Sequence, residues 1–173
     1  MLDRCDAARF LKVNHAGEHG AVSIYSGQML IARLTSPALL PTLAAFKVHE
    51  QTHRTIFGKE LRRRGIARCK SYWLCALGGY TLGVVSALLG VQAIASTTVS
   101  VERVVLRHLA QQLHILGDSD AAASAAIAAI LQDEQAHHDQ FASHIRHDRF
   151  LNKVVDAVVS AMTERVIHVG MRI

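Results

Sequence analysis

Glu50-Gln51-Thr52-His53 and Glu134-Gln135-Ala136-His137 are two copies of one Glu-x-x-His pattern. Residues three apart lie on the same face of an α-helix, so each copy can direct a carboxylate and an imidazole at one metal ion. Either copy alone is a weak indication, because 11 of the 173 residues are histidines and chance pairings with glutamate arise easily. A metal site has to be inferred from where the two copies stand in the chain.

Two further glutamates precede these copies at one fixed spacing. Glu18 precedes Glu50 at a spacing of 32, and Glu102 precedes Glu134 at the same spacing. The unit of one glutamate followed by Glu-x-x-His therefore recurs at an offset of 84, which indicates a duplicated helical hairpin. If each hairpin turns midway, its two glutamates lie level, about 24 Å from the turn. Six side chains can then meet at one depth of a four-helix bundle.

The residues around these glutamates favour burial. Glu102 lies in the largely apolar run of residues 99–106, and small residues such as Gly17 and Ala21 flank Glu18. Buried carboxylates cost several kcal/mol unless they are neutralised, and two divalent irons would neutralise four of them. Di-iron and di-manganese bundles use this ligand arrangement, one glutamate from each of two helices and Glu-x-x-His from each of the other two. We predict six metal ligands, with ordinary salt bridges as the alternative: Glu18, Glu50, His53, Glu102, Glu134 and His137.

The composition is typical of an all-α protein. The chain is half hydrophobic, its prolines are confined to positions 37 and 41, and its length suits one domain with a real core. The pattern predicts six helices, over residues 3–34, 37–64, 71–89, 91–116, 119–148 and 151–171. Pro37 suits a first helical turn, Gly65 suits a C-terminal cap, and Gly117 followed by Ser119 suits a stop and an N-cap.

These helices predict a ferritin-like four-helix bundle within one domain of residues 1–173. Its parts would be hairpin one at 3–64, an apolar crossover helix at 71–90, hairpin two at 91–148 and a C-terminal helix at 151–171. Residues 71–101 carry no charged side chain, and residues 72–90 have the length of a transmembrane helix. A spanning helix would put the hairpins on opposite sides of a bilayer, where they could not share a metal site. We expect it to pack on the bundle or to dip into one leaflet.

The charge balance indicates an anionic partner. The chain has a net charge of +5 and a pI of about 9.4, which nucleic acid or a membrane surface could match. Arg62, Arg63 and Arg64, then Arg68 and Lys70, directly precede the apolar segment. Basic residues beside an apolar helix indicate contacts with lipid headgroups, so we expect a membrane surface and no nucleic acid. The alternative is a solvated helix end.

The cysteines and the N-terminus restrict the cellular setting. Cys5, Cys69 and Cys75 form no Cys-x-x-Cys pair and are odd in number, so a disulfide framework and a zinc ribbon are both disfavoured. A reducing compartment fits best. The first residues lead into helical sequence without an apolar signal core or an arginine-rich presequence. We expect a bacterial cytoplasmic protein or a chain whose targeting segment has been removed.

Five other histidines stand near the predicted ligands in sequence. We expect these five to support ligands or to lie at the surface rather than to bind metal: His15, His19, His49, His108 and His138. His108 is the strongest candidate for a functional role, because it follows Glu102 at a spacing of six and could reach the rim of the site.

Beyond these six ligands, the order of motifs resembles the demethoxyubiquinone hydroxylase family of ubiquinone biosynthesis. The similar motifs are Asn-His-Ala-Gly-Glu-His-Gly-Ala at 14–21, Ile-Tyr-Ser-Gly-Gln at 24–28, Glu-Gln-Thr-His at 50–53, Ala-Leu-Leu-Gly at 87–90, Thr-Val-Ser-Val-Glu at 98–102 and Asp-Glu-Gln-Ala-His-His-Asp at 133–139. The resemblance covers nearly the whole chain in order. It implies the same six iron ligands, and it implies that His108 acts catalytically near the substrate. Members of the family often have tyrosine where this chain has His19, and some have tyrosine where it has Leu109. The leucine puts tyrosine-assisted electron transfer at position 109 in doubt.

The resemblance implies a di-iron monooxygenase that uses O2 to hydroxylate the ring of a polyprenylated methoxy-benzoquinone. Its cofactors would be two iron ions, cycling between Fe2+ and Fe3+, and an external reductant such as NADH. The protein would lie peripherally on the cytoplasmic face of a bacterial inner membrane, or on the matrix face of the mitochondrial one, with other ubiquinone-biosynthesis proteins as partners. The alternatives are a ferritin-like iron oxidase or store, a di-manganese catalase, and a membrane-binding bundle without enzymatic activity.

Overall fold

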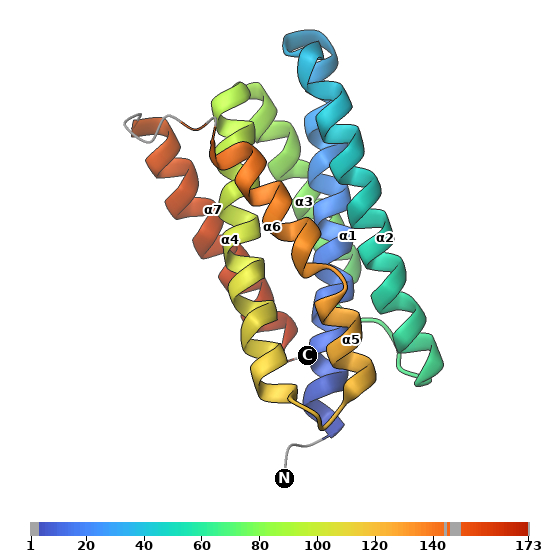
Figure 1. The fold of residues 1–173 in the computed structure, drawn as a ribbon. Coiled ribbons are helices and arrows are strands. Elements are labelled where there is room, and N and C mark those ends of the chain that lie inside the picture. Colours follow the sequence, from blue (N-terminus) through green and yellow to red (C-terminus); the bar gives the residue numbers. More distant parts are fainter. Residues whose placement is uncertain (1–3, 144, 146–149, 173) are drawn as a thin grey trace.

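Every regular element that the structure describes is helical. The computed structural model describes residues 4–143, 145 and 150–172, and it leaves the side chains of residues 4 and 5 undescribed. Figure 1 shows the order of the helices along the chain. They are α1 (Arg4–Thr35), the short 3-10 helix η1 (Pro37–Leu39), α2 (Leu40–Arg63), α3 (Tyr72–Leu88), α4 (Val91–Leu116), α5 (Ala121–Ala128), α6 (Leu131–Ala142) and α7 (Phe150–Gly170).

The bundle consists of two helical hairpins with one additional helix packed on each. α1 packs against α2 and, on its other side, against the crossover helix α3. α4 packs against α6 and α7, while α5 bridges α4 and α2. The prediction of an all-α, ferritin-like bundle with an apolar crossover helix is confirmed.

The second hairpin differs from the prediction in its returning arm. We predicted one helix over residues 119–148, whereas the structure has α5 and α6 separated by Ala129 and Ile130. Neither proline nor glycine marks this break, and Ile130 is fully buried in the core, so tertiary packing rather than a local signal accounts for it. The N-cap of α5 is Asp120 rather than Ser119, because the Asp120 side chain accepts the Ala123 N–H at 3.0 Å. Residues 144 and 146–148 of the predicted helix lie outside the described part.

Two apolar clusters fill the bundle above and below its middle. One joins residues of α1, α2, α4 and α5, among them Leu11, Phe57 and Leu109. The other joins residues of α1, α2, α3, α4 and α6, among them Tyr25, Phe46 and Phe141. The level between these clusters is therefore held by rigid packing from both directions.

Glycines allow α1 and α3 to lie in unusually close contact. A Cβ atom on Gly79 would overlap the carbonyl oxygen of Gly20, and one on Gly83 would overlap the carbonyl oxygen of Ile24. Larger residues at these positions would force the two backbones apart. Gly79 and Gly83 thus fix where the crossover helix lies.

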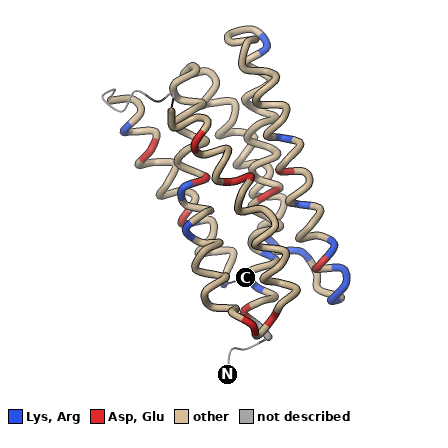
Figure 2. The backbone as a smooth tube through the Cα atoms, viewed as in Figure 1, with Lys and Arg blue, Asp and Glu red and all other residues tan. Residues whose placement is uncertain are grey.

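Two of the arginines in the basic run at the end of α2 form ion pairs within the fold. Arg64 contacts Asp120 at 2.5 Å and Glu60 at 2.6 Å, and Arg63 also contacts Glu60. The Arg64 guanidinium holds the pKa of Asp120 at about 2. These contacts tie the end of α2 to the beginning of α5. Arg62, Arg68 and Lys70 remain as exposed cations around the α2–α3 connection, where Figure 2 shows blue gathered.

Exposed apolar side chains concentrate on α3 and α7. On α3, the exposed fractions of Trp73, Leu74, Leu77 and Leu88 lie between 64% and 70%. The exposed apolar residues of α7 are Phe150, Leu151, Val154, Val158, Met162, Val166 and Val169. Within the described residues, none of the helices combines the length and hydropathy needed to cross a bilayer.

Candidate metal centre

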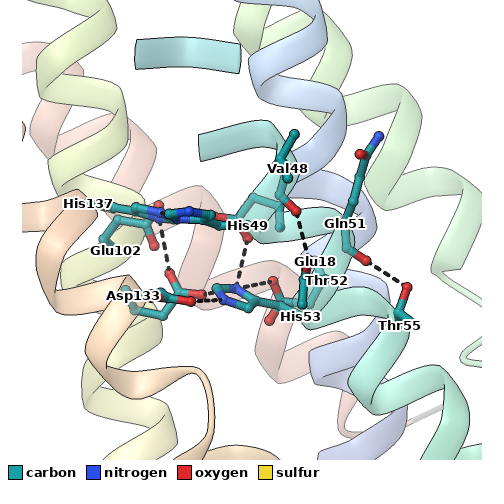
Figure 3. A network of polar contacts seen from close by, with 12 residues as sticks. Glu18, Val48, His49, Gln51, Thr52, His53, Thr55, Glu102, Asp133 and His137 are labelled. Atoms are coloured by element: carbon teal, nitrogen blue, oxygen red, sulfur yellow. Dashed lines mark hydrogen bonds and ion pairs between the residues drawn. The ribbon is translucent and has the colours of Figure 1, made fainter. Parts of the chain in front are cut away.

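The six predicted ligands come from four helices and meet in the middle of the bundle. α1 supplies Glu18, α2 supplies Glu50 and His53, α4 supplies Glu102, and α6 supplies Glu134 and His137. All six are at most 5% exposed. Figure 2 shows acidic residues gathered at this level of the bundle, and Figure 3 shows several of the side chains directed toward one another.

The donor atoms form two overlapping sets. Glu18, Glu50, His53 and Glu134 have donor atoms within 4.8 Å of one another, and so do Glu50, Glu102, Glu134 and His137. Glu50 and Glu134 belong to both sets, whereas Glu18 and Glu102 each belong to one. This arrangement fits two neighbouring cations that would share two carboxylates, each with its own imidazole.

Four atoms at the centre lack the hydrogen bonds that their burial demands. Glu50 Oε1, His53 Nδ1, Glu134 Oε1 and His137 Nδ1 are buried without a hydrogen-bond partner among the described residues. His53 Nδ1 lies 2.9 Å from Glu134 Oε1, and His137 Nδ1 lies 3.1 Å from Glu50 Oε1. These atoms therefore face one another at contact distance without forming hydrogen bonds, an arrangement that is costly unless a cation lies between them. The oxygen and nitrogen donor set therefore fits divalent metal ions such as iron or manganese.

The electrostatics of the site also favour a bound cation. Burial raises the pKa of Glu18 and of Glu102 well above the usual range. Burial and the nearby Glu50 carboxylate raise the pKa of Glu134 to about 8. Burial opposes ionisation of Glu50 too, but the imidazoles of His137 and His53 hold the pKa of its carboxyl at about 2. Four carboxylates cannot all be charged here without positive charge among them.

Three further residues support the predicted ligands from outside. His53 Nε2 lies 3.1 Å from Asp133 Oδ2, and His137 Nε2 lies 2.9 Å from His49 Nδ1 (Figure 3). The Tyr25 hydroxyl donates to Glu102 Oε1 at 3.2 Å. No role was predicted for Asp133 or Tyr25 from the sequence, although Asp133 directly precedes Glu134 and could have been noticed.

Within the described part of the chain, the other histidines lie outside both donor sets. His15 and His19 stack on Tyr72, and His138 lies 2.9 Å from Asp139. His108 Nε2 lies 2.8 Å from Glu164 Oε2 of α7. Burial and the neighbouring Arg107 lower the pKa of His108, which favours a neutral imidazole near pH 7.

An apolar cavity of about 310 Å³ connects the surface with the carboxylates. α1, α3, α4 and α7 form its walls, its inner end reaches all four glutamates, and His108 lies on its side. Leu74 of α3 and Val166 of α7 line it while also being exposed, so the cavity opens between these two helices. Its volume is in the range of sites for small organic ligands. That α7 forms one wall of this cavity was not predicted from the sequence.

Comparisons with known proteins identify a matching family and similar sequences. The family model of the ubiquinone biosynthesis protein COQ7 matches residues 6–170. A 3-demethoxyubiquinol 3-hydroxylase of Rhodospirillum rubrum is 34% identical over 131 residues, which are 76% of this chain and 61% of that protein. The mitochondrial NADPH-dependent 3-demethoxyubiquinone 3-hydroxylase of Mus musculus is 28% identical over 173 residues, covering 98% of this chain and 75% of that protein. The chain thus spans less than two thirds of the bacterial relative's length.

Proposed function

Because the chain belongs to the family of the ubiquinone biosynthesis protein COQ7, we propose that it hydroxylates the ring of a polyprenylated demethoxyubiquinone. The substrate would be the quinone or its quinol, since the two relatives described above are named for one form each. The observation that carries this proposal is the apolar cavity that leads from the surface to the four glutamates. An iron store needs a polar path for hydrated ions, and this path is apolar.

In this proposal residues 1–173 act as one di-iron domain. Two irons would be held by Glu18, Glu50, His53, Glu102, Glu134 and His137, with Glu50 and Glu134 shared. When bound, they would let the site reduce O2 with two electrons and two protons, so that one oxygen atom enters a ring C–H bond and the other leaves as water. A reduced nicotinamide dinucleotide would supply the electrons, as the name of the mouse relative indicates for that protein.

The residues around the cavity would position the ring and exclude water. Gly78, Gly79 and Leu82 of α3 and Val105 of α4 present an apolar surface to a flat quinone head. If His108 donates its Nε2 hydrogen to Glu164, Nδ1 is left to accept a hydrogen bond or a proton from a ring oxygen. Glu164 thus fixes the orientation of a cavity-wall imidazole, and we assign His108 to substrate positioning and proton transfer.

The cavity mouth supports a peripheral position on one face of a membrane. The exposed apolar residues of α3 and α7 flank the mouth, and a polyprenyl chain leaving it would run between them. Arg68 lies over the rings of Tyr72 and Trp73 at 5.0 and 5.3 Å, at the beginning of α3. Aromatic and cationic groups beside an apolar face suit the headgroup level of a bilayer. We propose that α3 and α7 together dip into one leaflet.

Quinone profiling tests the function. In a host that lacks its native demethoxyubiquinone hydroxylase, the protein is expected to restore ubiquinone and to consume the demethoxy precursor, as measured by mass spectrometry. A persistent precursor, in cells that contain the iron-loaded protein, would contradict the proposal and favour an iron oxidase or a catalase. Ferroxidase and hydrogen peroxide assays on the same protein would then separate these two.

A charge placed on α3 is expected to separate membrane access from catalysis. The double variant Leu77→Glu with Leu88→Glu removes two side chains that are each 66% exposed and that do not line the cavity. Lost insertion of two leucines costs roughly 2 kcal/mol or more, so binding to anionic vesicles should fall at least about tenfold. Turnover of a long-chain quinone should fall in parallel, whereas turnover of a short-chain soluble quinone should change little.

The matched control for this test is Leu34→Glu with Ile115→Glu. It adds the same charge at exposed apolar positions of α1 and α4, away from the mouth, and should leave vesicle binding near the native level. Arg63 and Arg64 are unsuitable for such a test, because their ion pairs with Glu60 and Asp120 stabilise the fold. Equal losses on both quinones would contradict membrane access through α3.

A further inference from the structure

The repeat at an offset of 84 makes the two cation sites comparable position by position. We call the set Glu18, Glu50 and His53 subsite A, and the set Glu102, Glu134 and His137 subsite B. The three ligands of subsite A match those of subsite B at this offset, and each subsite also has an oxygen of the other subsite's Glu-x-x-His glutamate within reach. The donor sets are therefore equivalent, and any difference must come from the residues that contact the donors.

The two ligand imidazoles have different partners at their outer nitrogen. Each points Nδ1 at the carboxylates, so Nε2 must carry the hydrogen for Nδ1 to bind a cation. His53 Nε2 then donates to the Asp133 carboxylate, while His137 Nε2 donates to Nδ1 of His49. Asp133 and His49 are themselves matched by the offset of 84. A carboxylate partner makes an imidazole a stronger donor to a metal ion than an imidazole partner does.

The unshared glutamates also differ in their partners. Tyr25 donates its hydroxyl hydrogen to Glu102 Oε1 at 3.2 Å, which draws charge from the carboxylate of subsite B. The position that matches Tyr25 is Leu109, a fully buried apolar residue that has no hydrogen to donate to Glu18. The carboxylate of subsite A therefore keeps more of its charge for a cation. Both differences act in the same direction.

We propose that the two subsites are unequal, and that the first divalent metal ion to bind occupies subsite A, at Glu18 and His53. This inference rests on the proposed two-metal site and deepens it. Asp133 strengthens subsite A, and His49 and Tyr25 weaken subsite B, so the three act as positioning residues through the ligands they contact. Partners of this kind change metal affinity about 10- to 100-fold, so a difference of that order between the subsites is expected.

Unequal binding steps alone would not establish the order. Two divalent cations this close repel each other, so the second would bind more weakly even if the subsites were identical. The location of the first ion has to be observed. Mn2+ is a suitable probe, because it accepts the same oxygen and nitrogen donors and its anomalous X-ray scattering locates it in a crystal.

The experiment supplies the full-length, metal-free protein with one equivalent of Mn2+ and locates the ion by anomalous diffraction. Occupancy is expected at Glu18 and His53, and calorimetry should show two steps that sum to two ions per chain. The exchange variant His49→Asp with Asp133→His, combined with Tyr25→Phe, reverses the first difference and removes the second, and it should move the first ion to Glu102 and His137. Should the exchange variant fail to fold, His49→Asp alone should tighten the second step about tenfold, and Tyr25→Phe should tighten it as well.

The control variant is Gln51→Asp, which adds the same charge at an exposed position of α2, next to Glu50. It should leave the order of binding unchanged, because a charge that does not contact His137 cannot change that imidazole's donor strength. A first ion at Glu102 and His137, or one divided evenly between the subsites, would overturn the inference and leave the two-metal proposal intact. Saturation below two ions per chain would overturn the two-metal proposal itself.

Discussion

Glu50→Ala and Glu134→Ala are each expected to abolish hydroxylation and to lower bound iron from two ions to one or fewer per chain. Both carboxylates belong to both donor sets, so neither subsite keeps its full set when one of them is lost. The loss of activity should exceed the roughly 10- to 100-fold losses seen when only a residue that supports a metal ligand is removed. Elemental analysis after anaerobic iron loading and a quinone hydroxylation assay measure the two effects.

Thermal unfolding of the metal-free variants distinguishes ligand loss from damage to the fold. Removal of one of four crowded buried carboxylates relieves repulsion, so metal-free Glu134→Ala should unfold at the native temperature or above it. Gln51→Ala, at an exposed position beside Glu50, is the control and should keep both iron and activity. Two irons and near-native turnover in either glutamate variant would show that the shared carboxylates are bystanders.

The meeting of the six side chains could be predicted because helices preserve sequence spacing. An offset of 84 between the halves and a spacing of 32 within each half fix the level of Glu18, Glu50, Glu102 and Glu134 as soon as the chain forms two hairpins. The helix break at Ala129 and Ile130 does not disturb this level, because it precedes Glu134 by one helical turn. The role of these residues as metal ligands stays a prediction that iron analysis tests.

The contacts around the ligands could not be predicted from spacing. Tyr25 reaches Glu102 from another helix, 77 residues away, and His49 reaches His137 across 88 residues. Such pairs depend on the rotation of each helix about its axis, which only the packing of the whole bundle sets. The twofold pattern suggested a symmetric site, yet the contacts around its two halves differ.

The cavity could not be predicted from the sequence either, because it is the space that α1, α3, α4 and α7 leave between them. The apolar residues of α3 indicated a surface for lipid, but the second wall of the mouth comes from α7. One local sign existed: the adjacent valine pairs at 154–155 and 158–159 put apolar side chains on two faces of α7. Val155 and Val159 are buried and their neighbours Val154 and Val158 are exposed, so α7 packs on α4 and still presents an apolar outer face.

In the crossover helix α3, alanine at position 79 is expected to lower the Tm, whereas alanine at the neighbouring position 78 is not. Gly79→Ala should destabilise the protein, because its Cβ would overlap the carbonyl oxygen of Gly20 and push α3 away from α1. Overpacking of this kind costs roughly 1–3 kcal/mol or more. At about 2–4 °C per kcal/mol for a chain of this size, the Tm should fall by several degrees. Differential scanning calorimetry of the metal-free protein measures the shift.

Gly78→Ala is the matched control, since nothing lies within 4 Å of a Cβ at that position. Alanine favours a helix over glycine by about 1 kcal/mol, so the Tm should stay the same or rise. Each variant adds one methyl group to α3 at adjacent residues. The methyl group points at α1 in Gly79→Ala, and it meets no other atom within 4 Å in Gly78→Ala. If both lowered the Tm equally, flexibility of α3 rather than close contact with α1 would explain the glycines. If neither did, α3 would not be held against α1 at all, and the cavity between α3 and α7 would lose the support of a fixed wall.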